Sequence, residues 1–245
     1  MKQYYIRQVL TGHSLQETSR ILREADERNA WEDGLVSVIG GGKKAFKNNL
    51  ELSDINLREA INTNIMSALD HDFAFRNYTI PATTTPNIIS KTPEGGYYNP
   101  HHDEWYNGNF STSVFLNDPS EYDGGELCLD FGDREYKFKL DAGWAISYST
   151  GLFHRVNHVT RGARYASVFW TKSLIRDEFA RHMYTTLGEI MTSIDKTPEN
   201  CFDAEYGEEM LTGDCGKASL SPMFCIDGLR KDILRKYAVT YDVNP

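Results

Sequence analysis

Residues 127–140 read LCLDFGDREYKFKL, and this stretch has the clearest β-strand pattern of the chain. Apolar and polar residues alternate on both sides of Gly132-Asp133, a dipeptide that favours two-residue hairpin turns. A turn at that place pairs Leu129 with Tyr136 and brings the apolar side chains of the two runs to one face. The stretch therefore predicts an antiparallel β-hairpin with one buried face.

The same two-residue period continues on either side of the hairpin. It is present over residues 111–116, 144–149 and 164–170, and Gly-containing turns separate these runs. Many short strands at regular spacing with such turns are typical of a jelly roll or barrel. The sequence therefore predicts a mainly β fold with flanking helices.

Helical patterns precede and follow the predicted strands. A capping box formed by Ser14 and Glu17 predicts a helix start, and a second helix is expected to begin near Ser53 or Asp54. Further helices are expected after Lys172 and near the end of the chain.

The chain therefore divides into three predicted zones that form one compact catalytic domain. We expect a helical supporting segment over residues 1–77, a β core over residues 78–175 and a helical extension over residues 176–245.

Composition excludes several classes of function. The chain of 245 residues has a net charge of −9 and no block of Lys and Arg that could neutralise a phosphate backbone, so nucleic-acid binding is not expected. No apolar run approaches the roughly 20 residues that span a bilayer, and the first residues lack a signal-peptide pattern. A cytoplasmic protein is the expectation, with thiols rather than disulfides at its four cysteines, which are Cys128, Cys201, Cys215 and Cys225.

Three residues have the spacing of a metal site. His101 and Asp103 are two positions apart, so on a strand both side chains point to one face, and His154 lies far downstream. Two histidines and one carboxylate can hold a ferrous ion and leave its other face open for oxygen and a co-substrate. His102 points to the opposite face in this arrangement and is the alternative ligand.

Arg164 is the second chemical signal. It lies on an apolar run that offers no acidic neighbour, and burying an unpaired guanidinium is unfavourable. A planar donor fork suits a carboxylate, so a bound organic acid is a sensible partner, and a distant Asp or Glu is the alternative. A hairpin of residues 153–158 with 163–170 would place Arg164 on the face that His154 uses.

The stretch from Ile88 to Asp177 resembles the iron(II)- and 2-oxoglutarate-dependent dioxygenases of the prolyl 4-hydroxylase superfamily, and within it the PKHD-type hydroxylases. The similarity rests on several ordered motifs, which are Tyr98-Asn99-Pro100-His101-His102-Asp103, Ser113-Val114-Phe115-Leu116-Asn117-Asp118, Tyr122-Asp123-Gly124-Gly125-Glu126-Leu127, His154-Arg155-Val156, and Val159-Thr160-Arg161-Gly162-Ala163-Arg164 running on to Trp170.

The resemblance implies a double-stranded β-helix core of the jelly-roll, cupin-like kind. It also implies iron(II) held by His101, Asp103 and His154, with Arg164 binding the distal carboxylate of 2-oxoglutarate. Oxygen is then the second co-substrate, ascorbate is a further candidate cofactor, and succinate and carbon dioxide are the products released.

The expected reaction is hydroxylation of a peptidyl proline in a protein or peptide substrate. Hydroxylation of another side chain or of a small molecule is the alternative with the same cofactors. A cupin-like metal-binding module without turnover and a metal-dependent isomerase or hydrolase are the alternatives from other classes.

The chain departs from the family at the hydroxyl that often assists the arginine. Phe115 and Thr92 stand at positions where many relatives have tyrosine, so Tyr98 or Thr92 is expected to supply the hydroxyl instead. Trp170 and Tyr148 are further candidates for the surroundings of the metal, with ordinary core packing as the alternative.

Overall fold

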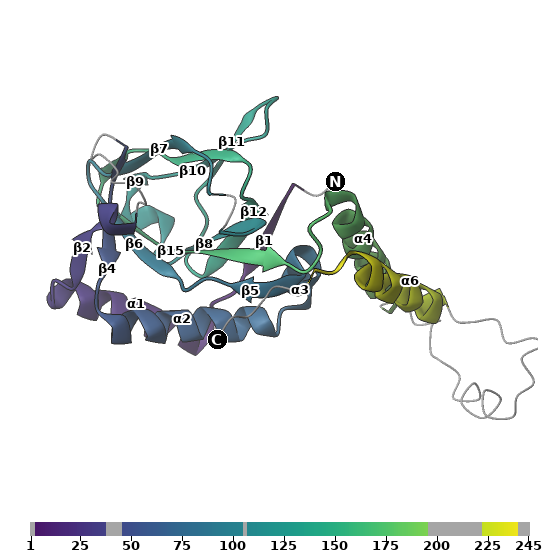
Figure 1. The fold of residues 1–245 in the computed structure, drawn as a ribbon. Helices are drawn as coiled ribbons and strands as arrows, with labels where there is room; N and C mark the ends of the chain where they lie inside the picture. Colours follow the sequence, from purple (N-terminus) through teal and green to yellow (C-terminus); the bar gives the residue numbers. More distant parts are fainter. Residues whose placement is uncertain (1–2, 38–45, 105–106, 196–221, 240–245) are drawn as a thin grey trace, which may run out of the picture. The chain divides into compact units, whose positions relative to one another are not determined.

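The computed structural model describes residues 3–37, 46–104, 107–195 and 222–239 (Figure 1). It separates into two compact units, residues 1–173 and residues 174–245. The boundaries of the three zones predicted from the sequence stay a prediction.

Two β-sheets form the first unit (Figure 1). The larger has the order β1-β12-β8-β15-β6-β4-β2, with β5 also paired to β15. Its strands are β1 (Tyr4–Gln8), β2 (Trp31–Asp33), β4 (Leu50–Leu52), β5 (Pro81–Thr84), β6 (Ile88–Pro93), β8 (Phe110–Phe115), β12 (Trp144–Ser149) and β15 (Ala163–Ser173).

The smaller sheet faces the inner side of the larger one and has the order β11-β10-β13-β7-β3. Its strands are β3 (Lys47–Asn48), β7 (Tyr97–His101), β10 (Leu127–Asp130), β11 (Glu135–Phe138) and β13 (Phe153–Val156). A two-stranded ribbon of β9 (Asp123–Gly124) and β14 (Val159–Arg161) lies beside them.

Apolar side chains close one end of the space between the sheets. The buried members are Phe115, Leu127, Leu129, Phe138, Ile146 and Tyr148. They come from both sheets because alternate residues of each strand point inward. This cluster leaves the other end of the space for polar groups.

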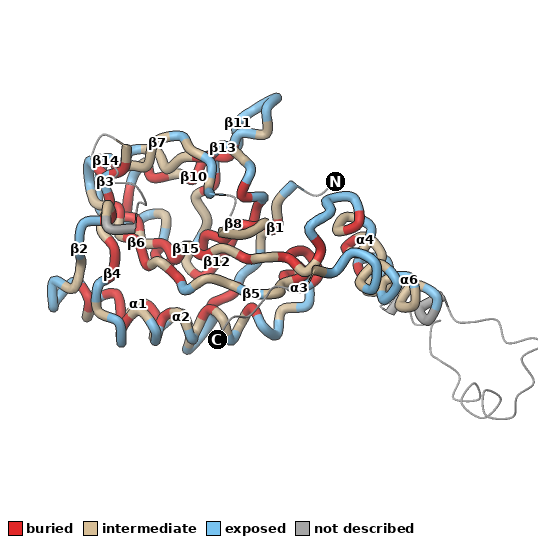
Figure 2. Tube along the Cα trace, in the orientation of Figure 1, coloured by how far each residue is buried: buried red, intermediate tan, exposed pale blue. Residues whose placement is uncertain are grey.

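Helices cover the outer side of the larger sheet (Figures 1 and 2). They are α1 (Gly12–Glu27), α2 (Ile55–Asp70) and α3 (Phe73–Thr79), and the short 3₁₀ turns are η1 (Gly34–Ser37) and η2 (Pro119–Glu121). Buried residues of α2 recur every three to four positions, as an amphipathic helix requires, and are Leu57, Ile61, Ile65 and Leu69. Figure 2 shows buried residues on the inner strands and on the helix faces that meet the sheet.

The predicted hairpin is confirmed. β10 pairs with β11 in the expected register, with Leu129 opposite Tyr136 and Leu127 opposite Phe138. The predicted second helix is also confirmed, because the Asp54 side chain caps α2 by accepting from the backbone N–H of the second and third residues that follow it.

The predicted hairpin of residues 153–158 with 163–170 is wrong. β13 pairs with β10 and β7 in the small sheet, whereas β15 pairs with β8, β6 and β5 in the large sheet. Gly162 instead joins β15 to β14 of the two-stranded ribbon, which lies between β13 and β15 in the chain. His154 and Arg164 therefore face each other across the sandwich.

The predicted start of the first helix is wrong. Helix α1 begins at Gly12, and its capping box is formed by Thr11 and Ser14, while Glu17 pairs with Arg20. The zone read as mainly helical also contributes β1, β2, β3 and β4 to the two sheets. The triple glycine at 40–42 lies outside the described residues.

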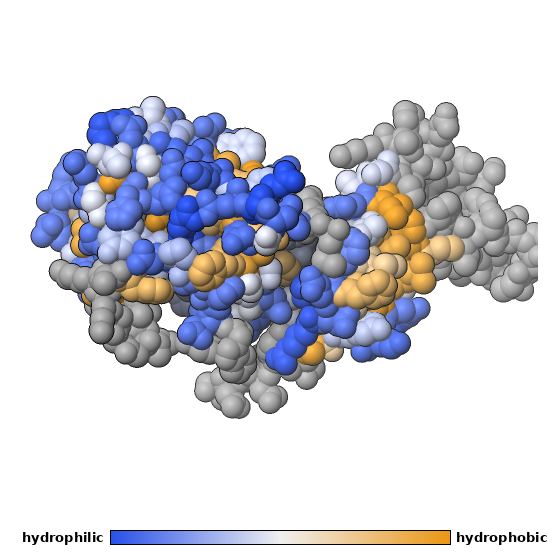
Figure 3. Space-filling view, turned by 90° about the horizontal axis from the view of Figure 1, so that it is seen from above, coloured by the Kyte–Doolittle hydropathy of each residue, from blue (hydrophilic) through white to orange (hydrophobic). Residues whose placement is uncertain are grey.

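The described residues of the second unit form two helices, where helices were predicted. They are α4 (Glu178–Asp195) and α6 (Pro222–Tyr237), and the Arg230 guanidinium lies 4.1 Å from the centroid of the Tyr184 ring. Apolar side chains remain exposed on this unit (Figure 3), and they are Phe179, Met183, Ile190 and Leu229. None of the described helices combines the length and apolar character that crossing a bilayer requires.

Two of the four cysteines lie in the described part of the chain. Cys128 is a buried free thiol on β10, and Cys225 is exposed on α6. Cys201 and Cys215 lie outside the described residues.

Candidate metal centre

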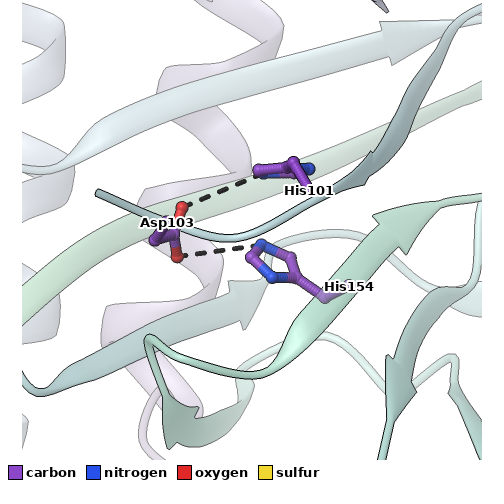
Figure 4. A group of neighbouring side chains, drawn as sticks. All are labelled: His101, Asp103 and His154. Atoms are coloured by element: carbon purple, nitrogen blue, oxygen red, sulfur yellow. Dashed lines mark ion pairs between the residues drawn. The ribbon is translucent and has the colours of Figure 1, made fainter. Parts of the chain in front are cut away.

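His101, Asp103 and His154 converge at the open end of the sandwich (Figure 4). His101 ends β7 and lies directly opposite His154 on β13, and Asp103 follows two residues beyond β7. One ligand atom from each residue lies within 4.8 Å of the other two. The Asp103 oxygens are 3.9 Å from Nε2 of His101 and 3.7 Å from Nε2 of His154. The three residues predicted from their spacing therefore share one site.

Backbone carbonyls fix the orientation of both imidazoles. Nδ1 of His101 lies 2.8 Å from the Asn99 carbonyl, and Nδ1 of His154 lies 3.0 Å from the Leu152 carbonyl. A carbonyl can only accept, so each Nδ1 carries a proton and Nε2 is the ring nitrogen left for a metal ion. Burial, followed by repulsion from a protonated His154 ring, lowers the pKa of His101 to about 4, which keeps His101 neutral and able to bind a metal ion at neutral pH.

Ser111 on β8 holds the carboxylate. Its hydroxyl donates to Oδ2 of Asp103, and the serine is fully buried in the large sheet. This bond ties the metal centre, whose histidines belong to the small sheet, to the large sheet. The sequence did not indicate Ser111, because only the packing of the two sheets places this residue beside Asp103.

Aromatic rings surround the histidines. Tyr98 stacks on His101 with ring centroids 3.9 Å apart, and Phe46 meets His101 edge-on at 5.8 Å. Tyr148 meets His154 edge-on at 5.3 Å. Burial, followed by the charge of Asp103, raises the pKa of Tyr98 to about 12, so its hydroxyl stays protonated.

His102, the alternative ligand, also lines the cavity around this group but is not among the three residues whose ligand atoms come together. Its Nδ1 lies 3.0 Å from the Gly151 carbonyl, and its exposed ring packs against Phe153.

Arg164 is buried in the large sheet, with 3% of its surface exposed. Among the described residues, no acceptor bonds its Nε and no carboxylate pairs with it. Its guanidinium lies 5.0 Å from the centroid of the Phe115 ring. Burial lowers the pKa of Arg164, as expected for a buried guanidinium with no carboxylate beside it. The distant acidic partner considered from the sequence is therefore absent from the described part of the chain.

One cavity of about 290 Å³ is lined by both the metal-site residues and Arg164. Arg164 and the three metal-site residues line it, and so do Thr92 and Tyr98, the two candidate hydroxyls. Thr92 lies opposite Arg164 on β6, but no hydrogen bond joins either hydroxyl to Arg164 in the described residues. The other predicted neighbours, Tyr148 and Trp170, also line the cavity.

The side chains of the cavity fit iron(II) and 2-oxoglutarate, which the sequence implies. Two imidazoles and one carboxylate suit a divalent iron ion. A guanidinium without a carboxylate partner, in the same cavity, suits the far carboxylate of a dicarboxylic acid. The cavity also has apolar walls, to which Leu127, Val156 and Val168 contribute.

Comparison with known proteins gives the family. The 2OG-Fe(II) oxygenase superfamily model matches residues 88–172. A PKHD-type hydroxylase of Acaryochloris marina is 34% identical over 207 residues, which cover 79% of this chain and 90% of that protein. A PKHD-type hydroxylase of Pseudomonas putida is 37% identical over 176 residues, which cover 67% of this chain and 77% of that protein.

Solved structures show the same fold. A Trichoplax adhaerens prolyl hydroxylase, in complex with a peptide of the hypoxia inducible factor oxygen degradation domain, aligns with a TM-score of 0.60 and 16% identity over 71% of this chain and 84% of that chain. A Pseudomonas putida prolyl-4-hydroxylase aligns with a TM-score of 0.56 and 16% identity over 70% and 92% of the two chains. The predicted jelly-roll core is therefore confirmed. The chain belongs to the PKHD-type hydroxylases of the 2OG-Fe(II) oxygenase superfamily.

Proposed function

We propose that this protein is an iron(II)- and 2-oxoglutarate-dependent dioxygenase that hydroxylates a prolyl residue of a protein or peptide. The observation that carries the proposal is the buried, uncompensated Arg164 in the same cavity as the three metal-site residues. The relatives named as hydroxylases support the chemistry, and the printed names of the two prolyl hydroxylase structures support the choice of proline.

His101, Asp103 and His154 would hold the iron, and Arg164 would bind the far carboxylate of 2-oxoglutarate. When bound, iron and 2-oxoglutarate supply oxidative decarboxylation, which consumes oxygen, releases succinate and carbon dioxide, and places a hydroxyl group on the substrate.

The chain supplies position and charge for this chemistry. The Asp103 carboxylate offsets part of the charge of a divalent ion, and the carbonyls of Asn99 and Leu152 hold the imidazoles in the tautomer that binds it. Tyr98 limits rotation of the His101 ring by stacking on it. Apolar walls exclude water, which strengthens the contact of Arg164 with a carboxylate.

The test follows succinate and substrate together. Wild-type protein with iron(II), ascorbate and 2-oxoglutarate should form succinate, and a proline-containing peptide that accelerates this turnover should gain one oxygen atom by mass. His154→Ala should abolish succinate formation. Arg164→Ala should raise the KM for 2-oxoglutarate by about tenfold or more, because a charged hydrogen-bonded contact is lost.

Two matched variants serve as controls. His102→Ala removes a neighbouring imidazole that lines the cavity but is not one of the three grouped metal-site residues, and Arg155→Ala removes an arginine that pairs with Glu135 outside the cavity. Both should keep succinate formation close to wild type. Absence of succinate from wild-type protein would contradict the oxygenase. Succinate formation without incorporation of oxygen into any prolyl peptide would still support the oxygenase but would contradict proline as the substrate.

A further inference from the structure

Lys47 and Glu51 form a buried ion pair on the wall of the cavity. Nζ of Lys47 lies 2.8 Å from Oε1 of Glu51, and 5% and 9% of the two side chains are exposed. Both residues line the cavity that contains the metal centre and Arg164. The proposed reaction gives a role to the other charged groups that this cavity buries, and it gives none to this pair.

The pair joins the two sheets next to the metal centre. Lys47 lies on β3 of the small sheet, and Glu51 lies on β4 of the large sheet (Figure 2). Nζ of Lys47 is 5.1 Å from the centroid of the Tyr98 ring, whose other neighbour is His101. A molecule held by the pair would therefore lie within reach of the metal centre.

Stability does not account for this pair. Removing two charges from water costs about as much as their attraction returns, and apolar residues of similar size often stabilise a protein as well or better. Both charges line a cavity, where they can contact a ligand that enters it. The neighbouring Asn49, which donates to Ser90 at 2.8 Å, adds further polar groups to the same wall.

The chemistry of the pair selects an uncharged, dipolar ligand. An anion would be attracted by Lys47 and repelled by Glu51, and a cation would meet the reverse. A secondary amide presents a carbonyl to the ammonium and an N–H to the carboxylate. The ammonium has three N–H donors and the carboxylate about four lone-pair sites, so each group can bind the amide in addition to the contacts that it already makes.

We propose that Lys47 and Glu51 form an amide-binding subsite that holds the peptide backbone beside the oxidised residue. The inference rests on the proposed function and narrows its substrate to a peptide, since a free amino acid presents an ammonium and a carboxylate where the pair takes a neutral amide. Lys47 donates to the amide carbonyl, and Glu51 accepts from the amide N–H.

The test compares two small probes that differ in one N–H. N-acetyl-L-proline N-methylamide has the amide that follows a prolyl residue, and N-acetyl-L-proline methyl ester has an oxygen in place of the N–H. Each is titrated by ligand-observed NMR into full-length protein loaded with zinc(II), which does not turn over, and 2-oxoglutarate. Wild-type protein should bind the amide about tenfold more tightly than the ester, because a hydrogen bond to a charged acceptor is lost.

Paired replacement tests the residues. Lys47→Met with Glu51→Leu removes both charges together, so that no unpaired charge is left buried, and this double variant should bind the two probes equally. Glu51→Gln keeps an acceptor oxygen without the charge and should show a smaller preference for the amide than wild type. Arg155→Met with Glu135→Leu removes an ion pair outside the cavity and should keep the full preference.

Calorimetry of zinc(II) and 2-oxoglutarate binding comes first for each variant. If wild-type protein binds neither, the proposed function fails and the inference fails with it. If both bind normally, the inference alone is overturned by any of three results: equal binding of amide and ester to wild type, no binding of either, or the full preference in the double variant or in Glu51→Gln.

Discussion

The hydroxyl of Ser111 donates to Oδ2 of Asp103 from a strand of the opposite sheet. Groups that orient metal ligands in this way typically contribute about 10- to 100-fold to metal affinity. We therefore expect Ser111→Ala to weaken zinc(II) binding by about that factor in isothermal titration calorimetry, and Ser111→Thr, which keeps the hydroxyl, to restore most of it.

Ser147→Ala is the matched control at this scale. Ser147 is equally buried in the large sheet, but its hydroxyl bonds that of Thr112, and neither residue lines the cavity. The zinc(II) affinity of Ser147→Ala should equal that of wild type. Equal affinity of Ser111→Ala and wild type would show that the hydroxyl does not orient the ligand.

The residues of the site differ in how far sequence could predict them. His101 ends β7 and Asp103 follows it two residues later, so a two-residue spacing in extended chain implies a common face, and a buried arginine without a local acid implies a ligand. Ser111 and Glu51 carry no such signal. Each acquires its role only when another strand places Asp103 or Lys47 beside it.

At the scale of elements, Gly143 joins three strands. Its carbonyl accepts from the N–H groups of Val9 and Leu10, its N–H donates to the Phe115 carbonyl, and its φ is +85°. A Cβ at this position would lie 2.3 Å from the Leu10 carbonyl oxygen. Substitution therefore costs both left-handed strain and a clash with backbone.

Gly143→Ala should lower the free energy of unfolding by about 3 kcal/mol, measured by urea denaturation. Gly132, in the hairpin turn, also has a positive φ of +89°, but a Cβ there meets nothing within 4 Å. Gly132→Ala should cost only about 1–2 kcal/mol. Equal losses would mean that the contact of Gly143 with Leu10 can relax.

Local pattern predicted one hairpin and not the other for a physical reason. The β10–β11 register is fixed by a two-residue turn between adjacent strands, so all the information is local. β13 and β15 are also close in sequence, but they belong to different sheets of the sandwich. Strands β3 and β4 have two and three residues, which is too short to show a period, and they escaped notice in a zone read as helical.

At the scale of the whole molecule, ligand binding should raise the free energy of unfolding. A ligand at about 100 times its Kd stabilises the folded state by about 2.7 kcal/mol, which raises the Tm of a protein of this size by about 5–10 °C. We expect zinc(II) with 2-oxoglutarate to produce a rise of this order in differential scanning calorimetry. His154→Ala should remove the rise, His102→Ala should keep it, and a rise that survives in His154→Ala would place the metal elsewhere.

The placement of His101 and His154 on one sheet and of Arg164 on the other has a consequence for the choice of co-substrate. A 2-oxo diacid bound at both places spans the gap between the sheets, and the packed apolar cluster fixes the width of that gap. We therefore expect the protein to favour 2-oxoglutarate over oxaloacetate, which is one carbon shorter, and over 2-oxoadipate, which is one carbon longer.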